Sequence, residues 1–473
     1  MLLSSSAYFI FFAAVFLAYW LSQRSAAYAR TLSLCVLVAA NFFFYAKWDL
    51  FYLALIPAAS FCGFFIGLGI ENAKGNDRAR KLLVSLSIAM NLGILVAFKY
   101  MGFLLENVAK LTGQPPPEWH WSFPLGISFY VFQSLTYTID LYRGDAKATK
   151  SPLAYCAAVS FFPTTLAGPI TRVAQLLPQL EKMNRRVDAN QSGQAFFLIA
   201  LGMMKKFLVA DYLSENLVNR IFDFPKLYTG FEVLIGVYGY ALQLYYDFSG
   251  YTDIAIGSAL LLALKLPANF NMPYAATSIA DFWRRWHISL SNWLRDYLYF
   301  SLPGLRGAKI FTYLNLTITM VLGGLWHGAS WNFVIWGLLH GVALGVTRAM
   351  QVAREADGRK EPRLPAWLRT FVTVQFVCFA WIFFRAGTLE LAFDVVTRIA
   401  SFTFSAANIP GSLWVVLGVA IAGHYLPKNW FERVRDLFGA APFYAQAAAL
   451  LLLTIAIQYI AATGAAPFIY TKF

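Results

Sequence analysis

Long apolar stretches recur along the whole chain and limit what it can fold into. Residues 7–21, 82–98, 371–384 and 447–460 are four of them. A helix needs about 20 mostly apolar residues to cross the hydrocarbon core of a bilayer, which is roughly 30 Å thick. Hydrophobic residues make up 59% of the chain and charged residues only 13%, which is more apolar than a typical soluble domain. The sequence therefore predicts an all-α polytopic membrane protein, since the strands of a membrane barrel would be short and alternating.

The positive charges predict the orientation of these helices. The first residues, MLLSSSAYFIFF, carry no positive charge, so we expect residues 7–21 to be a retained first span and not a cleaved signal peptide. By the positive-inside rule, basic loops between apolar stretches are cytosolic. These loops contain Lys74, Arg78, Arg80, Lys81, Arg143, Lys147, Lys150, Arg348, Arg354, Arg359, Lys360, Arg363, Lys428, Arg433 and Arg435. Both termini are then extracytoplasmic, and we expect an even number of spans, about 12, with re-entrant segments.

The distribution of charges and cysteines argues against nucleic-acid binding, disulfide bonds and a metal site. The net charge of +14 is spread over loops and forms no basic domain, so we expect no nucleic-acid partner. Cys35, Cys62, Cys156 and Cys378 lack the spacing of a metal site, and we expect buried thiols, no disulfide and no metal. A polar linker at residues 351–365 follows a motif-rich core at about 120–345 and precedes C-terminal helices at about 367–462 and a tail at 463–473. We expect one integral-membrane domain over residues 1–473.

The stretch DFWRRWHISLSNWLRDYL, residues 281–298, concentrates charge in a chain that has little of it. On a helix with about 100° per residue, one stripe would carry Arg284, His287, Ser291 and Arg295, and the opposite side would carry Trp286, Leu290, Trp293 and Tyr297. This pattern predicts an amphipathic helix at the membrane boundary. Either its arginines contact lipid phosphates beside interfacial tryptophans, or they bind the phosphates of an acyl donor with His287 nearby for chemistry. Periodicity alone leaves both interpretations open.

A second candidate centre is LGGLWHGASWNFVIWGLLHG, residues 322–341. His327 follows Trp326 in an apolar segment where an ionisable side chain is costly and marks a candidate functional site. The alternative is a neutral histidine that hydrogen-bonds a neighbouring helix. His340 points to a different helical face, and we expect a structural role for it, as for His120 and His424.

Polar residues also interrupt the apolar segments before these motifs. LQLYYDFSGYTDIAIG contains Gln243, Asp247 and Asp253, and NFNMPY begins with Asn269. Buried groups of this kind orient histidines or line a polar tunnel. We assign Gln243, Asp247 and Asn269, together with Trp326, to this supporting role, whereas for Asp253 we prefer a packing contact between helices.

Five segments together resemble bacterial membrane-bound O-acyltransferases (MBOAT) of the alginate O-acetyltransferase type. They are PLGISFYVFQSLTYTIDLYRG, FFPTTLAGPITR, LQLYYDFSGYTDIAIG, NFNMPYAATSIADFWRRWHISLSNWLRDYLY and LGGLWHGASWNFVIWGLLHG, in the family's order. The resemblance implies a ring of transmembrane helices around a central catalytic tunnel, with a cytosolic donor entrance and an outer funnel. One departure is SLPGLRGAK, residues 301–309, where relatives more often show a Gly-Gly-Asn-Arg-like turn.

The resemblance also implies roles for residues. The family's two histidines fall on His327 and His287. A hydroxyl that attacks a thioester such as acetyl-CoA must lose its proton, and a neutral imidazole with a pKa of about 6.5 suits that task, so we expect His327 to be the general base. We expect His287 to orient the thioester or support the developing charge, with Arg284, Arg295 and Ser291 on the donor side. Direct transfer needs no metal and no resident cofactor, because acetyl-CoA is the donor substrate.

The end of the chain, FIYTKF, resembles a C-terminal tyrosine motif of this family, Phe-x-Tyr-x-x-Phe, over Phe468, Tyr470 and Phe473. This implies an acyl relay in which the phenol of Tyr470 takes the acyl group from the active site and presents it outside. A phenyl ester suits such a relay because phenoxide, with a parent pKa of about 10, is a good leaving group. The alternative is an interfacial aromatic anchor.

Three functions remain open on the sequence. The first is an O-acetyltransferase of the bacterial inner membrane that moves acetyl groups from cytosolic acetyl-CoA to an extracytoplasmic alginate-, cellulose- or peptidoglycan-like polysaccharide. Its expected partners are an extracytoplasmic SGNH-type acetyltransferase and a polysaccharide synthase or export complex. The second is a D-alanyl transferase that acts on teichoic acid from a carrier-protein thioester. The third is a transporter or channel with a histidine proton relay, against which the lack of a recognisable internal repeat counts.

Overall fold

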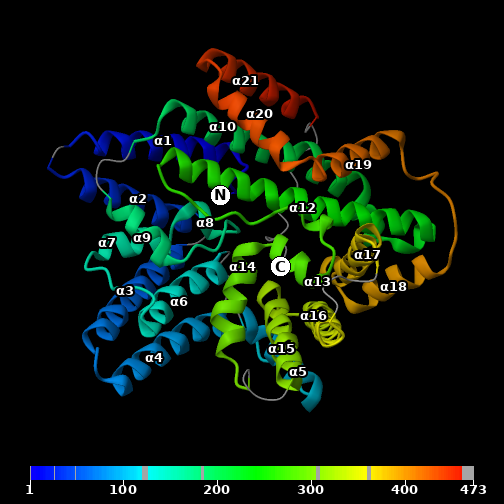
Figure 1. Cartoon of the computed structure of the whole chain (residues 1–473), viewed down its shortest axis with the longest axis horizontal. Helices are drawn as coiled ribbons and strands as arrows, with labels where there is room; N and C mark the ends of the chain where they lie inside the picture. Colours follow the sequence, from blue (N-terminus) through cyan, green and yellow to red (C-terminus); the bar gives the residue numbers. More distant parts are fainter. Residues whose placement is uncertain are drawn as a thin grey trace. The chain divides into compact units, whose positions relative to one another are not determined.

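The protein is helical throughout the part of the chain that the computed structural model describes. That part comprises residues 2–25, 27–47, 50–119, 126–182, 186–304, 309–358 and 364–460. Within these ranges every regular element is a helix, as Figure 1 shows. The predicted all-α class is therefore confirmed.

The chain folds into two compact units. Unit 1 comprises Met1–Ile199, Tyr251–Pro267 and Phe438–Ala440, and unit 2 comprises Ala200–Gly250, Ala268–Leu437 and Ala441–Phe473. Three helices contain residues of both units: α10 (Ala189–Met204), α12 (Gly230–Leu261) and α20 (Lys428–Ala440).

Unit 1 is a bundle of apolar helices with short connections. Its helices are α1 (Ser6–Ser22), α2 (Ala29–Ala46), α3 (Leu50–Asn72), α4 (Asp77–Leu95), α5 (Met101–Thr112), α6 (Ile127–Arg143), α7 (Pro152–Val159), α8 (Phe162–Thr165) and α9 (Val173–Glu181), with π-helical Val96–Tyr100 between α4 and α5. Side-chain oxygens cap several of their first turns: Ser5 accepts from the N–H of Tyr8, and Asn76 accepts from that of Ala79. The helices α3, α4 and α6 pack against one another.

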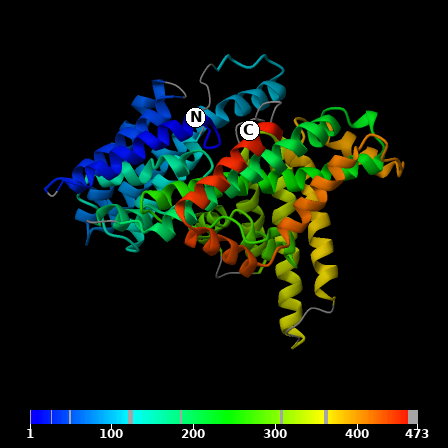
Figure 2. The same ribbon diagram turned by 90° about the horizontal axis from the view of Figure 1, so that it is seen from above.

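Unit 2 contains the two histidine motifs of the sequence. Its helices are α11 (Asn219–Asp223), α13 (Ile279–Arg285), α14 (Ile288–Trp293), α15 (Lys309–His327), α16 (Trp331–Ala356), α17 (Ala366–Arg385), α18 (Leu389–Ala400), α19 (Gly411–His424) and α21 (Phe443–Ile460). Shorter π-helical or 3₁₀ turns are Lys205–Asp211, Ser214–Val218, Pro225–Leu227, Pro273–Ala275, Leu294–Leu298 and Tyr299–Ser301. Figure 2 shows, in yellow, the C-terminal half of α16 beside the start of α17.

The helices α15 and α16 approach each other unusually closely. A Cβ atom at Gly324 would lie 2.1 Å from the carbonyl oxygen of Phe333, and one at Gly337 would lie 2.4 Å from that of Met320. Only glycine permits these backbone contacts, which resemble the small-residue interfaces of membrane helix pairs. This tight pairing fixes the end of α15, where His327 lies.

Several helices are long and apolar enough to cross a membrane. Among the described residues they are Ala29–Ala46, Leu53–Asn72, Asp77–Thr112, Trp331–Ala356 and Ala366–Arg385, and the bent pair Lys428–Ala440 with Phe443–Tyr459 adds a candidate sixth. Apolar side chains such as Leu82 and Leu451 are exposed on the helix surfaces, which suits contact with lipid. The multi-pass membrane character is confirmed, whereas a ring of about 12 spans remains a prediction.

The cysteine prediction is only partly right. Cys156 and Cys378 are buried as expected, but Cys35 on α2 and Cys62 on α3 are exposed. Both lie on apolar helices that are candidate membrane spans. A cysteine on the lipid-facing surface of a span has apolar neighbours in the sequence, as does a cysteine in a protein core. The sequence therefore could not distinguish the exposed Cys35 and Cys62 from the buried Cys156 and Cys378.

Candidate active site

The helix predicted over residues 281–298 is interrupted at His287, so that prediction is wrong. α13 ends at Arg285 and α14 begins at Ile288. Between them, His287 has a φ angle of 41°. A residue with a side chain adopts this left-handed conformation at a cost of roughly 1 kcal/mol or more, and such residues cluster at functional sites. Counting helical faces from Arg284 to Arg295 is therefore not valid.

A backbone pairing with residues 269–271 accompanies the interruption. The N–H of Asn271 donates to the carbonyl of Arg285 at 2.9 Å, and the N–H of Ile288 donates to the carbonyl of Asn269, also at 2.9 Å. Met272, just past the paired segment, has a φ of 47°. The polar NFNMPY segment thus provides the hydrogen bonds that a continuous helix would have made within itself.

The interruption separates Arg284 from His287. The Arg284 side chain is 71% exposed and lies 3.6 Å from Asp281, whereas His287 is completely buried. The two residues were expected on one stripe, and that expectation is wrong. A surface cation and a buried imidazole instead lie three positions apart in the sequence.

The other two residues of the expected stripe lie on either side of the end of α14. The hydroxyl of Ser291 donates to the backbone carbonyl of Trp286 at 3.2 Å. The exposed guanidinium of Arg295 makes hydrogen bonds of 2.7 and 3.1 Å to Asp296. This contact raises the pKa of Arg295 above its ordinary value. Arg295 remains available to an anion at its exposed edge, since its side chain is 56% exposed.

His287 is held by a small polar network. Its Nδ1 lies 3.3 Å from Oδ1 of Asn269, and the same oxygen accepts from the N–H of Ser289 at 3.2 Å and from its hydroxyl at 2.7 Å. The ring of Phe248 is edge-on to the imidazole at 4.7 Å. The supporting role expected of Asn269 thus has a geometric basis, and Ser289 is a further member that the sequence did not indicate.

His327 is the last residue of α15, and its buried imidazole lies among aromatic rings. The rings of Trp326, Trp336 and Phe384 lie 4.9, 5.2 and 5.0 Å from it. Trp326 also lies 6.1 Å from the ring of His287. The two histidines predicted for catalysis therefore lie beside one indole, although 40 positions separate them in the sequence.

The remaining described histidines make contacts that suit structural roles. Nδ1 of His340 accepts from Nε1 of Trp283 at 3.2 Å. Nε2 of His424 accepts from the N–H of Tyr274 at 3.2 Å, and its ring is edge-on to Tyr245 at 4.6 Å. These contacts agree with the expectation that neither is catalytic.

Asp247 on α12 belongs to a buried charge network that the sequence did not reveal. Lys206 Nζ lies 2.8 Å from Oδ1 of Asp211 and 3.0 Å from Oδ1 of Asp247, and the three side chains are 4, 9 and 3% exposed. Gln243, one helical turn before Asp247, is also buried, and its Oε1 has no hydrogen-bond partner among the described residues. Lys206 lies in the π-helical turn Lys205–Asp211, a kind of turn that is frequent at functional sites.

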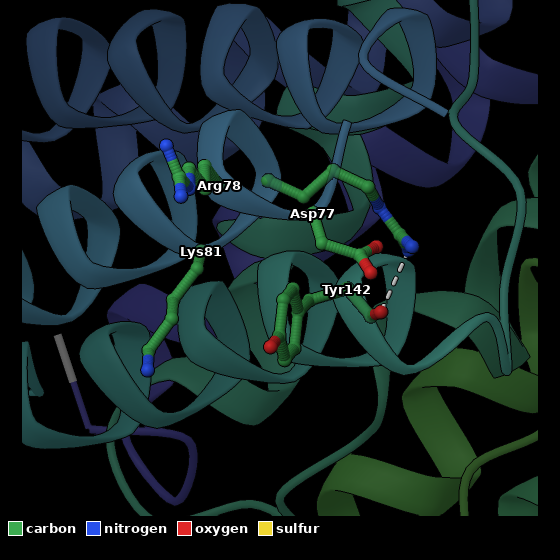
Figure 3. Close-up of a pocket in the computed structure, with 5 residues that line it drawn as sticks. Asp77, Arg78, Lys81 and Tyr142 are labelled. Carbon is green, nitrogen blue, oxygen red and sulfur yellow. Dashed lines mark hydrogen bonds between the residues drawn. The ribbon is translucent and has the colours of Figure 1, made fainter. Parts of the chain in front are cut away.

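An open surface cavity lies in unit 1, and its residues are distant in the sequence from both histidines. It has a volume of about 380 Å³ and is lined by Asp77, Arg78, Arg80, Lys81 and Tyr142. Figure 3 shows Arg78 and Lys81 near Tyr142. Arg80 donates a hydrogen bond of 2.7 Å to the Tyr142 carbonyl. The start of α4 and the end of α6 therefore lie side by side in this unit, and their position on the cytosolic side remains a prediction.

Two expected features lie outside the residues that the structure describes. Tyr470, with Phe468 and Phe473, is in the C-terminal segment 461–473, and His120 is in the segment 120–125; the structure describes neither segment. Over the described ranges, no group of three or more His, Cys, Asp or Glu side chains is arranged to hold a metal ion.

Comparison with known proteins identifies the protein family. The model of the membrane-bound O-acyltransferase family, MBOAT, matches residues 90–389, which is more than half of the chain. The protein therefore belongs to this family of acyltransferases. It is 39% identical to the probable alginate O-acetylase AlgI of Azotobacter vinelandii over 85% of this chain and 78% of that protein. The corresponding protein of Pseudomonas putida is 34% identical over the whole of both chains, and the peptidoglycan O-acetyltransferase of Helicobacter pylori is 37% identical over 82% of this chain and 77% of that one.

The protein is thus a multi-pass membrane O-acyltransferase.

Proposed function

We propose that this protein is an O-acetyltransferase of the bacterial inner membrane that passes acetyl groups from cytosolic acetyl-CoA to an extracytoplasmic polysaccharide. The observation that carries the proposal is the buried arrangement of His287 and His327 beside the indole of Trp326. The relatives are an alginate O-acetylase and a peptidoglycan O-acetyltransferase, which supports acetyl as the group transferred. Alginate-, cellulose- and peptidoglycan-like polymers are all compatible acceptors.

His327 is the proposed general base. It takes the proton of an acceptor hydroxyl while the hydroxyl oxygen attacks the thioester carbonyl carbon. The carbon–sulfur bond then breaks, and the imidazolium returns the proton to the departing thiolate, so that coenzyme A leaves as the thiol. The rings of Trp326, Trp336 and Phe384 exclude water from His327, which limits hydrolysis of the thioester.

Arg284 and Arg295 are the proposed contacts for the donor's phosphates. Both guanidiniums are on the surface and each already lies beside one carboxylate, so a phosphate would add to or replace that contact. We place this surface in the cytosol and the two termini outside, with Tyr470 as first acceptor and an SGNH-type acetyltransferase, together with a polysaccharide synthase or export complex, receiving the acetyl group.

Purified protein in lipid nanodiscs tests the donor and the reaction together. With radiolabelled acetyl-CoA we expect release of the free thiol of coenzyme A and label on the protein or on an added acceptor. Turnover only with a D-alanyl carrier-protein thioester would assign the protein to teichoic acid modification instead. Absence of acyl transfer from either donor, in protein that retains its thermal unfolding transition, would contradict the proposal.

A further inference from the structure

The hydrogen bonds around Asn269 determine which way its amide points. The backbone N–H of Ser289 can only donate, and it lies 3.2 Å from the terminal atom of Asn269 that faces it. A flipped amide would present its own NH₂ group to this donor. The facing atom must therefore be the carbonyl oxygen, Oδ1.

The same oxygen determines the tautomer of His287. Nδ1 of His287 lies 3.3 Å from Oδ1 of Asn269. An amide oxygen has no hydrogen to give, so Nδ1 must carry the hydrogen of this bond. In a neutral imidazole the other nitrogen, Nε2, then has a lone pair and no hydrogen.

The surroundings of His287 favour the neutral ring. It is completely buried, and its contacts among the described residues include Phe248 from α12, Trp326 from α15 and Asn269, which Ser289 holds in place. None of these is charged, and burial without an opposite charge disfavours the imidazolium. Among the described residues, Nε2 has no hydrogen-bond partner. A buried polar atom without a partner is costly, and in a strained residue of an enzyme it points to a ligand.

We propose that Asn269 and Ser289 hold His287 as the Nδ1–H tautomer, so that its Nε2 accepts a hydrogen bond from an N–H or O–H group of the bound substrate. This inference rests on the proposed function and changes one part of it. A neutral imidazole of this tautomer cannot donate from Nε2 to a developing oxyanion. His287 orients the substrate as an acceptor, and Asn269 and Ser289 act as positioning residues.

Nitrogen NMR measures the tautomer without reference to activity. Protein labelled with ¹⁵N-histidine in nanodiscs has five histidines, and the His287→Gln variant identifies the signals of His287. We expect a protonated Nδ1 and an unprotonated Nε2 at neutral pH. An Nε2–H tautomer or an imidazolium at His287 would overturn the inference. The expected tautomer in protein without acyl transfer would contradict the proposed function and leave the assignment of Nδ1–H in place.

Asn269→Asp tests the role in catalysis. The carboxylate still accepts from Ser289 and from Nδ1, but its charge favours the imidazolium, which has a hydrogen on Nε2. We expect acetyl transfer to fall about tenfold for each pH unit below the new titration midpoint and to recover as the pH rises. The pH profile of the wild type should show only the acid limb of the general base His327, without this additional one. If His287 acts as an oxyanion donor, the variant will be as active as the wild type or more active at neutral pH, and the inference fails.

Asn315→Asp is the matched control. Asn315 is also buried in unit 2, but its amide donates to the backbone carbonyl of Pro303 at 2.9 Å and does not contact a histidine. This variant can lose stability, but the pH dependence of its acetyl transfer should show no acid limb beyond that of the wild type. Ser289→Ala removes one donor to Asn269 and keeps the backbone N–H, so we expect only a loss of several-fold, about that of one hydrogen bond, with the same tautomer.

Discussion

The buried charges of Lys206, Asp211 and Asp247 allow a prediction of how a substitution changes the free energy of unfolding. Lys206→Met removes the one cation among three buried side chains and leaves the carboxylates of Asp211 and Asp247 close together. Removing one partner of a buried ion pair costs about 3–5 kcal/mol, because the other partner loses its strongest attraction in a medium of low dielectric constant. For a unit of roughly 250 residues, each kcal/mol lowers the unfolding midpoint by about 2 °C, so we expect a drop of about 6–10 °C.

Two further variants make the test specific. Asp247→Asn leaves Lys206 paired with Asp211 and should cost only about 1–2 kcal/mol. Lys226→Met is the matched control: Lys226 lies 2.8 Å from Asp394, but its side chain is 74% exposed, so its loss should leave the unfolding midpoint almost unchanged. Differential scanning fluorimetry in one detergent compares all three. Equal midpoints for Lys206→Met and Lys226→Met would refute the reasoning.

Three other predictions concern the reaction. His327→Ala should lower acetyl transfer by at least about 100-fold without changing the unfolding midpoint by more than a few degrees, and normal transfer would exclude it as the base. Arg284→Ala and Arg295→Ala should each raise KM for acetyl-CoA roughly tenfold at little cost in kcat, and should leave KM for S-acetylpantetheine, which lacks coenzyme A's phosphates, unchanged. Tyr470→Phe should abolish label on the C-terminal peptide in mass spectrometry after incubation with labelled acetyl-CoA, and full polysaccharide acetylation by this variant would rule out the relay.

The helices could be predicted because their signal is local and long. The apolar stretches at residues 7–21, 371–384 and 447–460 all lie within single helices, since a run of this length and composition is helical in a membrane whatever its neighbours are. The N-terminal limits follow local rules as well. Asn76, for example, caps the first turn of α4.

Lys206 shows why part of the site was missed. In the sequence it follows Lys205, and such a basic pair is typical of a solvated loop. Its burial depends on Asp247, which comes from α12 some 40 positions later. Pairings over this distance are not visible in composition or periodicity. The one available signal was an unexplained carboxylate at Asp247 in an apolar segment, which predicted that a partner exists without identifying it.

His287 shows the opposite case, in which the residue was identified and its geometry was not. Helical periodicity placed it beside Arg284, but its left-handed backbone depends on hydrogen bonds from residues 269–271. The difference matters for mechanism. On a continuous helix one cation and one imidazole would meet the same part of a ligand, whereas here Arg284 is exposed and His287 is buried. Coenzyme A separates its phosphates from its thioester by a long flexible arm. A donor that binds by its phosphates at the surface and presents its thioester inside needs this separation, and the interruption at His287 provides it within three residues.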